Sequence, residues 1–379
     1  MGDALRELKA GRSGISPTSS ILETNHTELP VGEVKRSSKD LSESLKVVEN
    51  YPRVTLLGIH AAREAVANSG INIKKWRTGL ISSTTVGGMD RTEMFFKEFV
   101  LDKSKGNLED IKYHPAGTTS DLIARDLGIT DFVSTINTAC SSSANSLMLG
   151  ARLIQSGRLD VVICGGVDAL TRFTLNGFNS LMILSSERCK PFDANRKGLN
   201  LGEGAGFLVL ASEKVIREEV LQSNCVISGY GNASDAFHQT ASSPDGRGSF
   251  KAMSEALKMA ELDRSAIGYI NAHGTGTVNN DLSESTAIKR LFGSVPKFSS
   301  TKGFTGHTLA ACGAIEAIFS TMAIEQNCVF GNAGFETQMP DVDITPQSGF
   351  ISDVKIDHVL SNSFGFGGNC SSVIFSRAS

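Results

Sequence analysis

Apolar residues along the chain fall into two kinds of segment, helically spaced ones and short continuous runs. Helical spacing extends over residues 56–69 and again over 250–261. Each of these predicted helices is followed by a short apolar run, at 78–88 and at 267–271, which is typical of a buried strand. Strands that alternate with helices favour mainly parallel sheets covered by helices.

The same order of elements then occurs a second time. In the first half, a predicted strand at 132–136 leads into a helix and on to the strand 160–166. In the second half, a predicted strand at 296–300 leads into another helix, and the closing strands 202–210 and 365–374 also correspond. This near-repeat predicts two similar α/β halves.

The length of the chain agrees with two halves. Its 379 residues exceed what a single hydrophobic core usually serves, so we place the halves at 1–222 and 223–379. The segments 16–52 and 171–198 have weak periodicity, and we expect them to form excursions at a cap and an interface.

Charge and cysteine content exclude several classes of protein. The net charge is −3 without a basic stripe, which argues against nucleic-acid binding. No apolar run reaches the ~20 residues of a membrane span, and the first residues lack the apolar core of a signal peptide. The seven cysteines are scattered and lack CxxC spacing, so we expect free thiols in a cytoplasmic protein and no zinc site.

Cys140 occupies the most informative position in the chain. It follows the predicted strand 132–136 and precedes helically spaced apolar residues, so its thiol is expected at the N-terminus of a helix. Unpaired N–H groups and the helix dipole lower a thiol pKa there, and they also stabilise an oxyanion. The sequence therefore predicts a nucleophilic cysteine, whereas the other cysteines are interpreted as packed core residues.

Two histidines are candidate partners for this thiol. His273 follows a predicted strand in the segment 271–277, which is rich in glycine and threonine. His307 closes the segment 302–307 and precedes a helix. Together the two segments predict a cysteine that acts with two imidazoles.

With the segment 362–368 (Asn-Ser-Phe-Gly-Phe-Gly-Gly), these motifs resemble an elongating β-ketoacyl-[acyl-carrier-protein] synthase, from about Gly11 to near the C-terminus. The resemblance implies a thiolase-like α/β fold with five layers, α-β-α-β-α, whose reactive groups converge where the halves meet. It implies a homodimer that works with acyl carrier protein and needs no metal or redox cofactor, the phosphopantetheine arm of the carrier being part of the substrate. The same resemblance covers fatty-acid, polyene and polyketide products.

The resemblance also implies a reaction, the decarboxylative Claisen condensation of an acyl group with malonyl carrier protein. Cys140 would carry the acyl group, and His273 and His307 would donate hydrogen bonds to the enolate oxygen formed when carbon dioxide leaves. The backbone N–H groups of Cys140 and Phe366 would hold the oxyanion during carbon attack.

Further site residues follow from the same resemblance. Lys302 is expected to set charge and hydrogen bonding near the histidines, and Glu284 to hold the Lys302 and His273 region together. Thr275 and Thr277 are expected to bind the phosphopantetheine arm. A separate interpretation has Met89, Phe178 and Met182 line the acyl pocket and set chain length.

Phe366 resembles the gating phenylalanine of the family, since the glycines on either side let its loop move. The next residues depart from the family pattern: Asn369-Cys370 stands where Thr-Asn is usual, which changes the hydrogen bonds that support the gate. Arg196-Lys197-Gly198 stands where Arg-Asp-Gly is common, and we expect this change to alter loop pairing or to favour an acidic carrier protein.

The start of the chain is a third departure. Family members usually begin with a short apolar strand, whereas this chain begins at the segment that follows it. We expect that strand to lie inside the first sheet, so that its absence leaves backbone groups of its neighbours unpaired and lowers the stability of the first half.

Four other classes of protein use related chemistry or a related fold. Initiating synthases place an asparagine where His307 stands, and thiolases use a second cysteine near their C-terminal glycines, where Cys370 lies close but outside the pattern. A non-catalytic partner subunit that shapes chain length would lack the nucleophile. A cysteine hydrolase would also use a cysteine and a histidine, and net thioester hydrolysis would reveal it.

Overall fold

The computed structural model describes residues 2–17, 19–47 and 50–378, and its frame is two mixed β-sheets. The first sheet consists of β3 (Thr78–Ser83), β4 (Phe132–Ile136), β5 (Val161–Asp168) and β6 (Gly204–Ala211). Their order is β4-β3-β5-β6, and β6 runs antiparallel to β5. The parallel β4-β3-β5 core carries helices in its connections, as the alternation of predicted elements requires.

The second sheet repeats this arrangement and adds one strand. It consists of β7 (Cys225–Ser234), β8 (Tyr269–Asn271), β9 (Lys297–Ser299), β10 (His358–Phe364) and β11 (Asn369–Arg377). The order is β7-β11-β10-β8-β9, with β11 antiparallel to both of its neighbours. Without β7, the order β9-β8-β10-β11 matches that of the first sheet, and the predicted duplication is confirmed.

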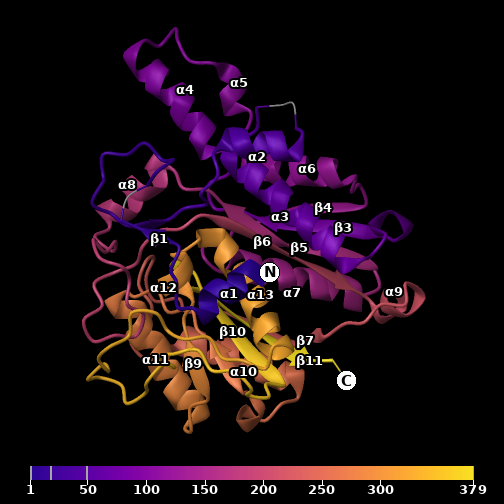
Figure 1. The fold of residues 1–379 in the computed structure, drawn as a ribbon, viewed down its shortest axis with the longest axis vertical. Helices are drawn as coiled ribbons and strands as arrows, with labels where there is room; N and C mark the ends of the chain where they lie inside the picture. Colours follow the sequence, from indigo (N-terminus) through magenta and orange to yellow (C-terminus); the bar gives the residue numbers. More distant parts are fainter. Residues whose placement is uncertain (1, 18, 48–49, 379) are drawn as a thin grey trace.

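Helices complete five layers (Figure 1). The first sheet carries α3 (Arg53–Ser69) and α6 (Ala116–Leu127) on its outer face, and the second carries α10 (Arg247–Ala260) and α11 (Val278–Phe292). Between the sheets lie α7 (Ser142–Gln155) and α13 (Cys312–Glu325), which contact each other and both sheets. This is the predicted α-β-α-β-α arrangement.

The strands are buried on both faces, which explains their continuous apolar runs. On β5, Val161 and Ile163 belong to the core beneath α3, whereas Val162 and Cys164 belong to the core around α7 and α13. Burial on all sides also explains α13, whose apolar residues show little helical periodicity. A helix enclosed in this way places its N-terminus in the interior of the molecule.

The two sheets differ at one edge. In the second sheet β7, the first strand of its half, lies at the edge beside β11. The equivalent position in the first sheet is the free side of β6, where no strand of the described residues pairs. Among the described residues, the first sheet therefore has no counterpart of β7.

The remaining helices and short strands lie outside the two main sheets and the helices named above. They are α1 (Gly2–Lys9), β1 (Ile15–Ser16), β2 (Val31–Gly32), α2 (Ser38–Leu45), α4 (Met89–Leu101), α5 (Leu108–Ile111), α8 (Arg172–Ser180), α9 (Glu213–Glu218) and α12 (Lys302–Thr305). Short 3₁₀ turns are η1 (Ile73–Lys75), η2 (Arg264–Ala266), η3 (Leu309–Ala311) and η4 (Phe366–Gly368). The α4–α5 pair projects from the body, and α4 buries none of its residues (Figure 1).

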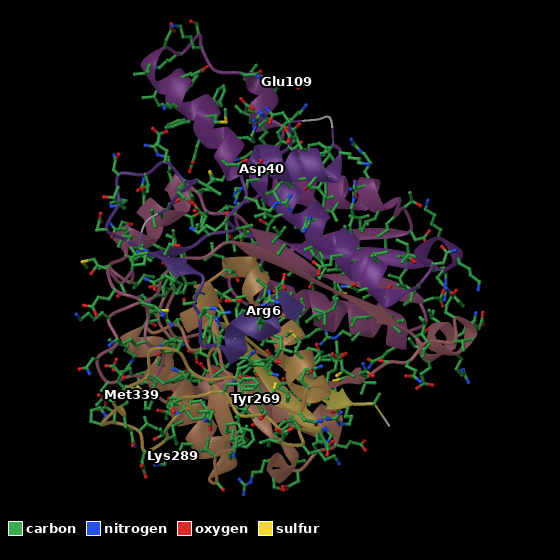
Figure 2. All side chains as sticks on the ribbon, viewed as in Figure 1. Arg6, Asp40, Glu109, Tyr269, Lys289 and Met339 are labelled. Carbon is green, nitrogen blue, oxygen red and sulfur yellow. The ribbon has the colours of Figure 1, made fainter. Side chains whose placement is uncertain are left out.

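The side chains of the projecting helices differ in position from those of the buried strands. In Figure 2, Glu109 lies at the projecting end on α5, whereas Tyr269 on β8 lies in the opposite half and is fully buried. None of the described helices has the length and apolar character to cross a bilayer.

Candidate active site

The nucleophile lies on a sharp turn between β4 and α7. Ala139, just before Cys140, has a φ of +52°, and Leu309, at the equivalent place before α13, also has +52°. Both values lie in the left-handed region, which costs energy for residues with a side chain. The duplicated halves thus share one strained turn, and in the first half it carries the thiol.

His307 lies against this thiol, with its Nε2 atom 3.0 Å from Sγ of Cys140. The other ring nitrogen, Nδ1, accepts a hydrogen bond of 3.2 Å from the backbone N–H of Leu309. A neutral imidazole that accepts at Nδ1 carries its proton on Nε2. His307 therefore presents an N–H donor toward the reaction centre.

His273 is fixed in the same way by a different group. The ammonium group of Lys302 lies 3.2 Å from Nδ1 of His273 and 2.6 Å from its backbone oxygen. Since an ammonium group only donates, Nδ1 accepts and the proton of the ring is on Nε2. The two imidazole rings meet edge to face, with centroids 5.4 Å apart. The predicted pair of histidine donors is brought together with Cys140.

Burial keeps both imidazoles uncharged. It lowers the pKa values of His273 and His307 well below the usual range, and the positive charge of Lys302 lowers both further. At neutral pH both rings are therefore neutral, as the role of hydrogen-bond donor to a developing oxyanion allows. Neither ring needs to be charged for that role.

The thiol itself differs from the sequence-based expectation of a lowered pKa. Burial raises the pKa of Cys140 to about 11, although Lys302 and two backbone N–H groups, those of Phe366 and Cys140, act in the opposite direction. The loss of water around the thiolate outweighs the helix terminus. The expectation of a lowered pKa was wrong because desolvation depends on the tertiary fold.

Those two N–H groups also fit the predicted oxyanion site. Phe366 and Cys140 both direct backbone donors to the region of Sγ. The gate loop approaches so closely that a Cβ on Gly365 would lie 2.6 Å from the backbone oxygen of Thr138. Glycine is thus required where the Phe366 loop meets the nucleophile turn.

Lys302 is buried and paired with Glu316, a residue outside the motifs that predicted the site. Burial alone would lower the pKa of Lys302, but Glu316 outweighs it and holds that pKa above its ordinary value. The carboxylate of Glu316 thereby keeps the ammonium group charged beside Nδ1 of His273. A lone acidic residue in the apolar segment 312–324 was the signal that pointed to it.

Glu284 supports the histidine turn from the other side. Its two oxygens accept hydrogen bonds of 2.9 and 2.8 Å from the backbone N–H groups of His273 and Gly274. Burial raises the pKa of Glu284 to about 7. Glu284 thus holds the His273 turn, whereas the ion pair of Lys302 is formed with Glu316.

A second buried acid, Asp168, was also missed. It lies at the end of β5 and accepts hydrogen bonds from Thr84, Thr85 and the backbone N–H of Ala310. These bonds tie the end of the first sheet to the turn that carries His307. A carboxylate at the end of an apolar strand was the signal available in the sequence.

The sulfur of Cys140 and the ring nitrogens of the two histidines are atom types that also bind metal ions. Sγ of Cys140 and ring nitrogens of His273 and His307 lie within 4.8 Å of one another. A metal at Nε2 would require each ring proton to move to Nδ1, where Leu309 and Lys302 already donate. The residues therefore do not fit a metal bound through Nε2.

A cavity of about 260 Å³ leads to the thiol. Thr275 and Thr277 line it, and their hydroxyl groups lie 2.8 Å apart. Phe178 and Met182 also line it, whereas Met89 begins α4 and is not among its lining residues, and their expected role in setting chain length stays a prediction. The threonine hydroxyls are thus placed to meet a ligand that enters toward Cys140.

Phe366, the residue expected to act as a gate, lines this cavity. Its ring stacks on Phe178, with centroids 5.9 Å apart and planes inclined by 15°. The loop is bonded to a neighbouring loop twice, from the N–H of Gly367 to the oxygen of Gln239 and from the N–H of Asp235 to the oxygen of Gly368, both at 2.7 Å. These two bonds join the loop of Phe366 to the segment 235–239.

Asn369 shows how the altered gate sequence is supported. Its Oδ1 atom accepts hydrogen bonds from Ser141 (2.7 Å), Asn145 (2.9 Å), Asn232 (3.0 Å) and Ser371 (3.2 Å). Ser141 directly follows the nucleophile, so this amide joins the gate to the start of α7. The departure from the family sequence brings its own set of hydrogen bonds.

Cys370 lines the same cavity, but it is not among the donor atoms that lie within 4.8 Å of Sγ of Cys140. Its Sγ lies 3.9 Å from the hydroxyl of Ser249 on α10, and burial raises its pKa to about 12. The donor atoms gathered around the nucleophile come from His273 and His307. This arrangement disfavours the two-cysteine chemistry of a thiolase.

Known proteins are similar to this chain in sequence and in structure. The family model "Beta-ketoacyl synthase, N-terminal domain" matches residues 5–215, and "Beta-ketoacyl synthase, C-terminal domain" matches 224–336. The chain is 34% identical over 362 residues to a 3-oxoacyl-[acyl-carrier-protein] synthase 2 of Staphylococcus aureus, covering 91% of this chain and 87% of the relative.

Solved structures of ketosynthases are also similar to this chain. "The ishigamide ketosynthase/chain length factor" is similar with a TM-score of 0.93 and 29% identity, covering 100% of this chain and 95% of that one. A type II PKS acyl-carrier protein in complex with its ketosynthase has a TM-score of 0.86 and 25% identity, covering 99% and 94%. The fold, the site and these matches together show that the chain belongs to the β-ketoacyl synthase family.

Proposed function

We propose that this protein extends an acyl chain by decarboxylative Claisen condensation with malonyl carrier protein. The observation that carries the proposal is the pair of neutral imidazoles that present Nε2–H groups beside one buried thiol. Two donors aimed at one point suit an enolate oxygen, whose charge develops only as the reaction proceeds.

The first step transfers the acyl group to the enzyme. Sγ of Cys140 attacks the thioester carbonyl, the bond to the carrier sulfur breaks, and the thiol proton of Cys140 ends on the released carrier thiol. The backbone N–H groups of Cys140 and Phe366 stabilise the tetrahedral oxyanion. Because burial raises the pKa of Cys140, the uncharged thiol is the resting form, and attack is coupled to loss of its proton.

The second step forms the new carbon–carbon bond. The malonyl group loses carbon dioxide, and the electron pair of the broken bond becomes an enolate whose oxygen receives hydrogen bonds from His273 and His307. The enolate carbon attacks the acyl carbonyl on Cys140, the bond to Sγ breaks, and the thiolate takes up one proton. Lys302 acts through His273, because it holds Nδ1 and leaves the donor on Nε2.

The phosphopantetheine arm of acyl carrier protein is the proposed bearer of both substrates, and no metal or redox cofactor is required. Thr275 and Thr277, which line the cavity, are the proposed contacts for its amide groups.

A cytoplasmic location is proposed because all seven cysteines are free. A dimer is supported by the edge strand β4 and by the unburied apolar residues of α4, including Phe96 and Leu101.

A product assay tests the proposal against its rivals. The protein is incubated with acyl carrier protein and malonyl carrier protein, and the carrier is analysed by mass spectrometry, with Cys140→Ala as the matched control. The proposal predicts a β-ketoacyl carrier with the wild type and none with the variant. Free fatty acid without condensation product would support a hydrolase, and an inert wild type that activates a second subunit would support a chain-length-shaping partner.

A further inference from the structure

One positive charge stands in the lining of the cavity. The residues that line it include Lys197 and Asp235 as the charged side chains beside the histidines. Asp235 is buried, and its oxygens accept hydrogen bonds from the backbone N–H and hydroxyl of Ser243 and from the N–H of Gly248. Those fixed donors stabilise the Asp235 carboxylate, and Lys197 is the one lysine or arginine among the described lining residues.

Lys197 stands at the opening rather than near the thiol. Its side chain is 62% exposed, whereas Cys140 at the other end of the same cavity is 5% exposed. A ligand that extends from Cys140 to the exposed part of this cavity can therefore reach the ammonium group of Lys197.

The ammonium group is also available for exchange of partners. It pairs with Glu187 at 2.6 Å, but both side chains are more than half exposed. Such exposed pairs contribute little to stability, so replacing Glu187 by another anion costs little. A buried pair like that of Lys302 and Glu316 would not release its cation in this way.

We infer that Lys197 binds the phosphodiester of the carrier arm while the thioester end of that arm lies at Cys140. This inference rests on the proposed function, because it takes phosphopantetheine as the ligand. The phosphodiester is the one charged group of the arm, and a lysine pairs with phosphate as a point charge. Lys197 stands where the family commonly has an acidic residue, so this departure places a cation where the phosphate passes.

The test compares two small substrates that differ only in phosphate. Acylation of Cys140 is measured with acyl-pantetheine and with acyl-phosphopantetheine, for the wild type and for Lys197→Ala. The inference predicts that the variant loses about fivefold in kcat/KM with the phosphorylated substrate and nothing with the other. Loss with both substrates, or with neither, would overturn it.

Two further variants sharpen the result. Lys190 lies on the same segment and pairs with the exposed Glu336 at 3.2 Å, but it does not line the cavity, so Lys190→Ala should change neither rate. Glu187→Gln removes the competing anion and should raise kcat/KM for the phosphorylated substrate only. Because it leaves Lys197 in place, a gain cannot come from misfolding.

A last experiment uses the complete acyl carrier protein as the substrate. If Lys197→Ala slows acylation from carrier protein but not from acyl-phosphopantetheine, the lysine meets acidic side chains of the carrier, and the phosphate contact is wrong. If acyl-pantetheine fails to acylate even the wild type, the proposed function is in question, which is a different outcome from the loss of phosphate discrimination.

Discussion

Nε2 of His307 lies 3.0 Å from Sγ of Cys140, while the opposite nitrogen of the ring is held by the N–H of Leu309. Leu309 adopts its left-handed φ in the turn that corresponds to the nucleophile turn of the first half. The duplicated fold thus brings one strained turn with a thiol against another that fixes the proton of an imidazole.

The raised thiol pKa predicts an unusual pH profile for alkylation. With the pKa of Cys140 at about 11, the thiolate fraction rises roughly tenfold with each pH unit through the neutral range. The rate of iodoacetamide labelling at Cys140, followed by peptide mass spectrometry, should rise without a plateau up to about pH 9. A plateau below about pH 8 would show that the helix terminus outweighs burial.

The histidine tautomers can be observed directly. Nitrogen-15 NMR of histidine-labelled protein should show His273 and His307 as neutral rings with the proton on Nε2, still unprotonated at about pH 6 because burial lowers both pKa values. Spectra of His273→Ala and His307→Ala assign the signals. The lowered pKa values also make the free energy of unfolding depend on pH. The stability that comes from keeping both rings neutral is complete above the ordinary histidine pKa, and it is lost as the pH falls toward the lowered pKa values of the folded state.

The buried pair of Lys302 and Glu316 should matter for both stability and rate. Glu316→Gln leaves the Lys302 charge buried without its counter-ion, and breaking such a pair typically costs about 3–5 kcal/mol of unfolding free energy. Chemical denaturation measures this loss of unfolding free energy.

Lys302→Met frees Nδ1 of His273, so it should slow decarboxylation more than acylation of Cys140. Equal slowing of both steps would contradict a role through His273.

The amide of Asn369 should couple the gate to the nucleophile turn. Asn369→Ala removes the acceptor shared by Ser141 and Asn145, so we expect slower acylation with a small loss of stability. Asn369→Thr, which restores a single oxygen, should recover part of the rate. Stopped-flow acylation with the melting temperature as control checks this, and unchanged acylation in Asn369→Ala would remove the residue from the gate.

Much of the fold was predictable because its signals are local. The repeated order of strands and helices reports burial that is nearly the same in both halves, and Cys140, His273 and His307 lie in short segments where strands end. The partner of Lys302 was not predictable with the same ease, because Glu316 lies on a different element and the pairing is a tertiary contact.

The thiol pKa was predicted in the wrong direction for the same reason. A helix terminus can be read from the sequence, but the burial of Cys140 arises only when the two halves close around it. The support of the gate by Asn369 also depends on contacts between segments more than 200 residues apart. Electrostatics and long-range hydrogen bonds therefore need the structure.

The central claim, that Cys140 carries the acyl group while the histidines promote decarboxylation, is tested most directly by separating the two steps. Single-turnover mass spectrometry would follow acyl-Cys140 formation and then its consumption by malonyl carrier protein, in the wild type and in His307→Ala. The account predicts near-normal acylation of the variant and condensation slowed about 10²–10³-fold. Normal condensation in His307→Ala, or an acyl group found on a residue other than Cys140, would contradict it.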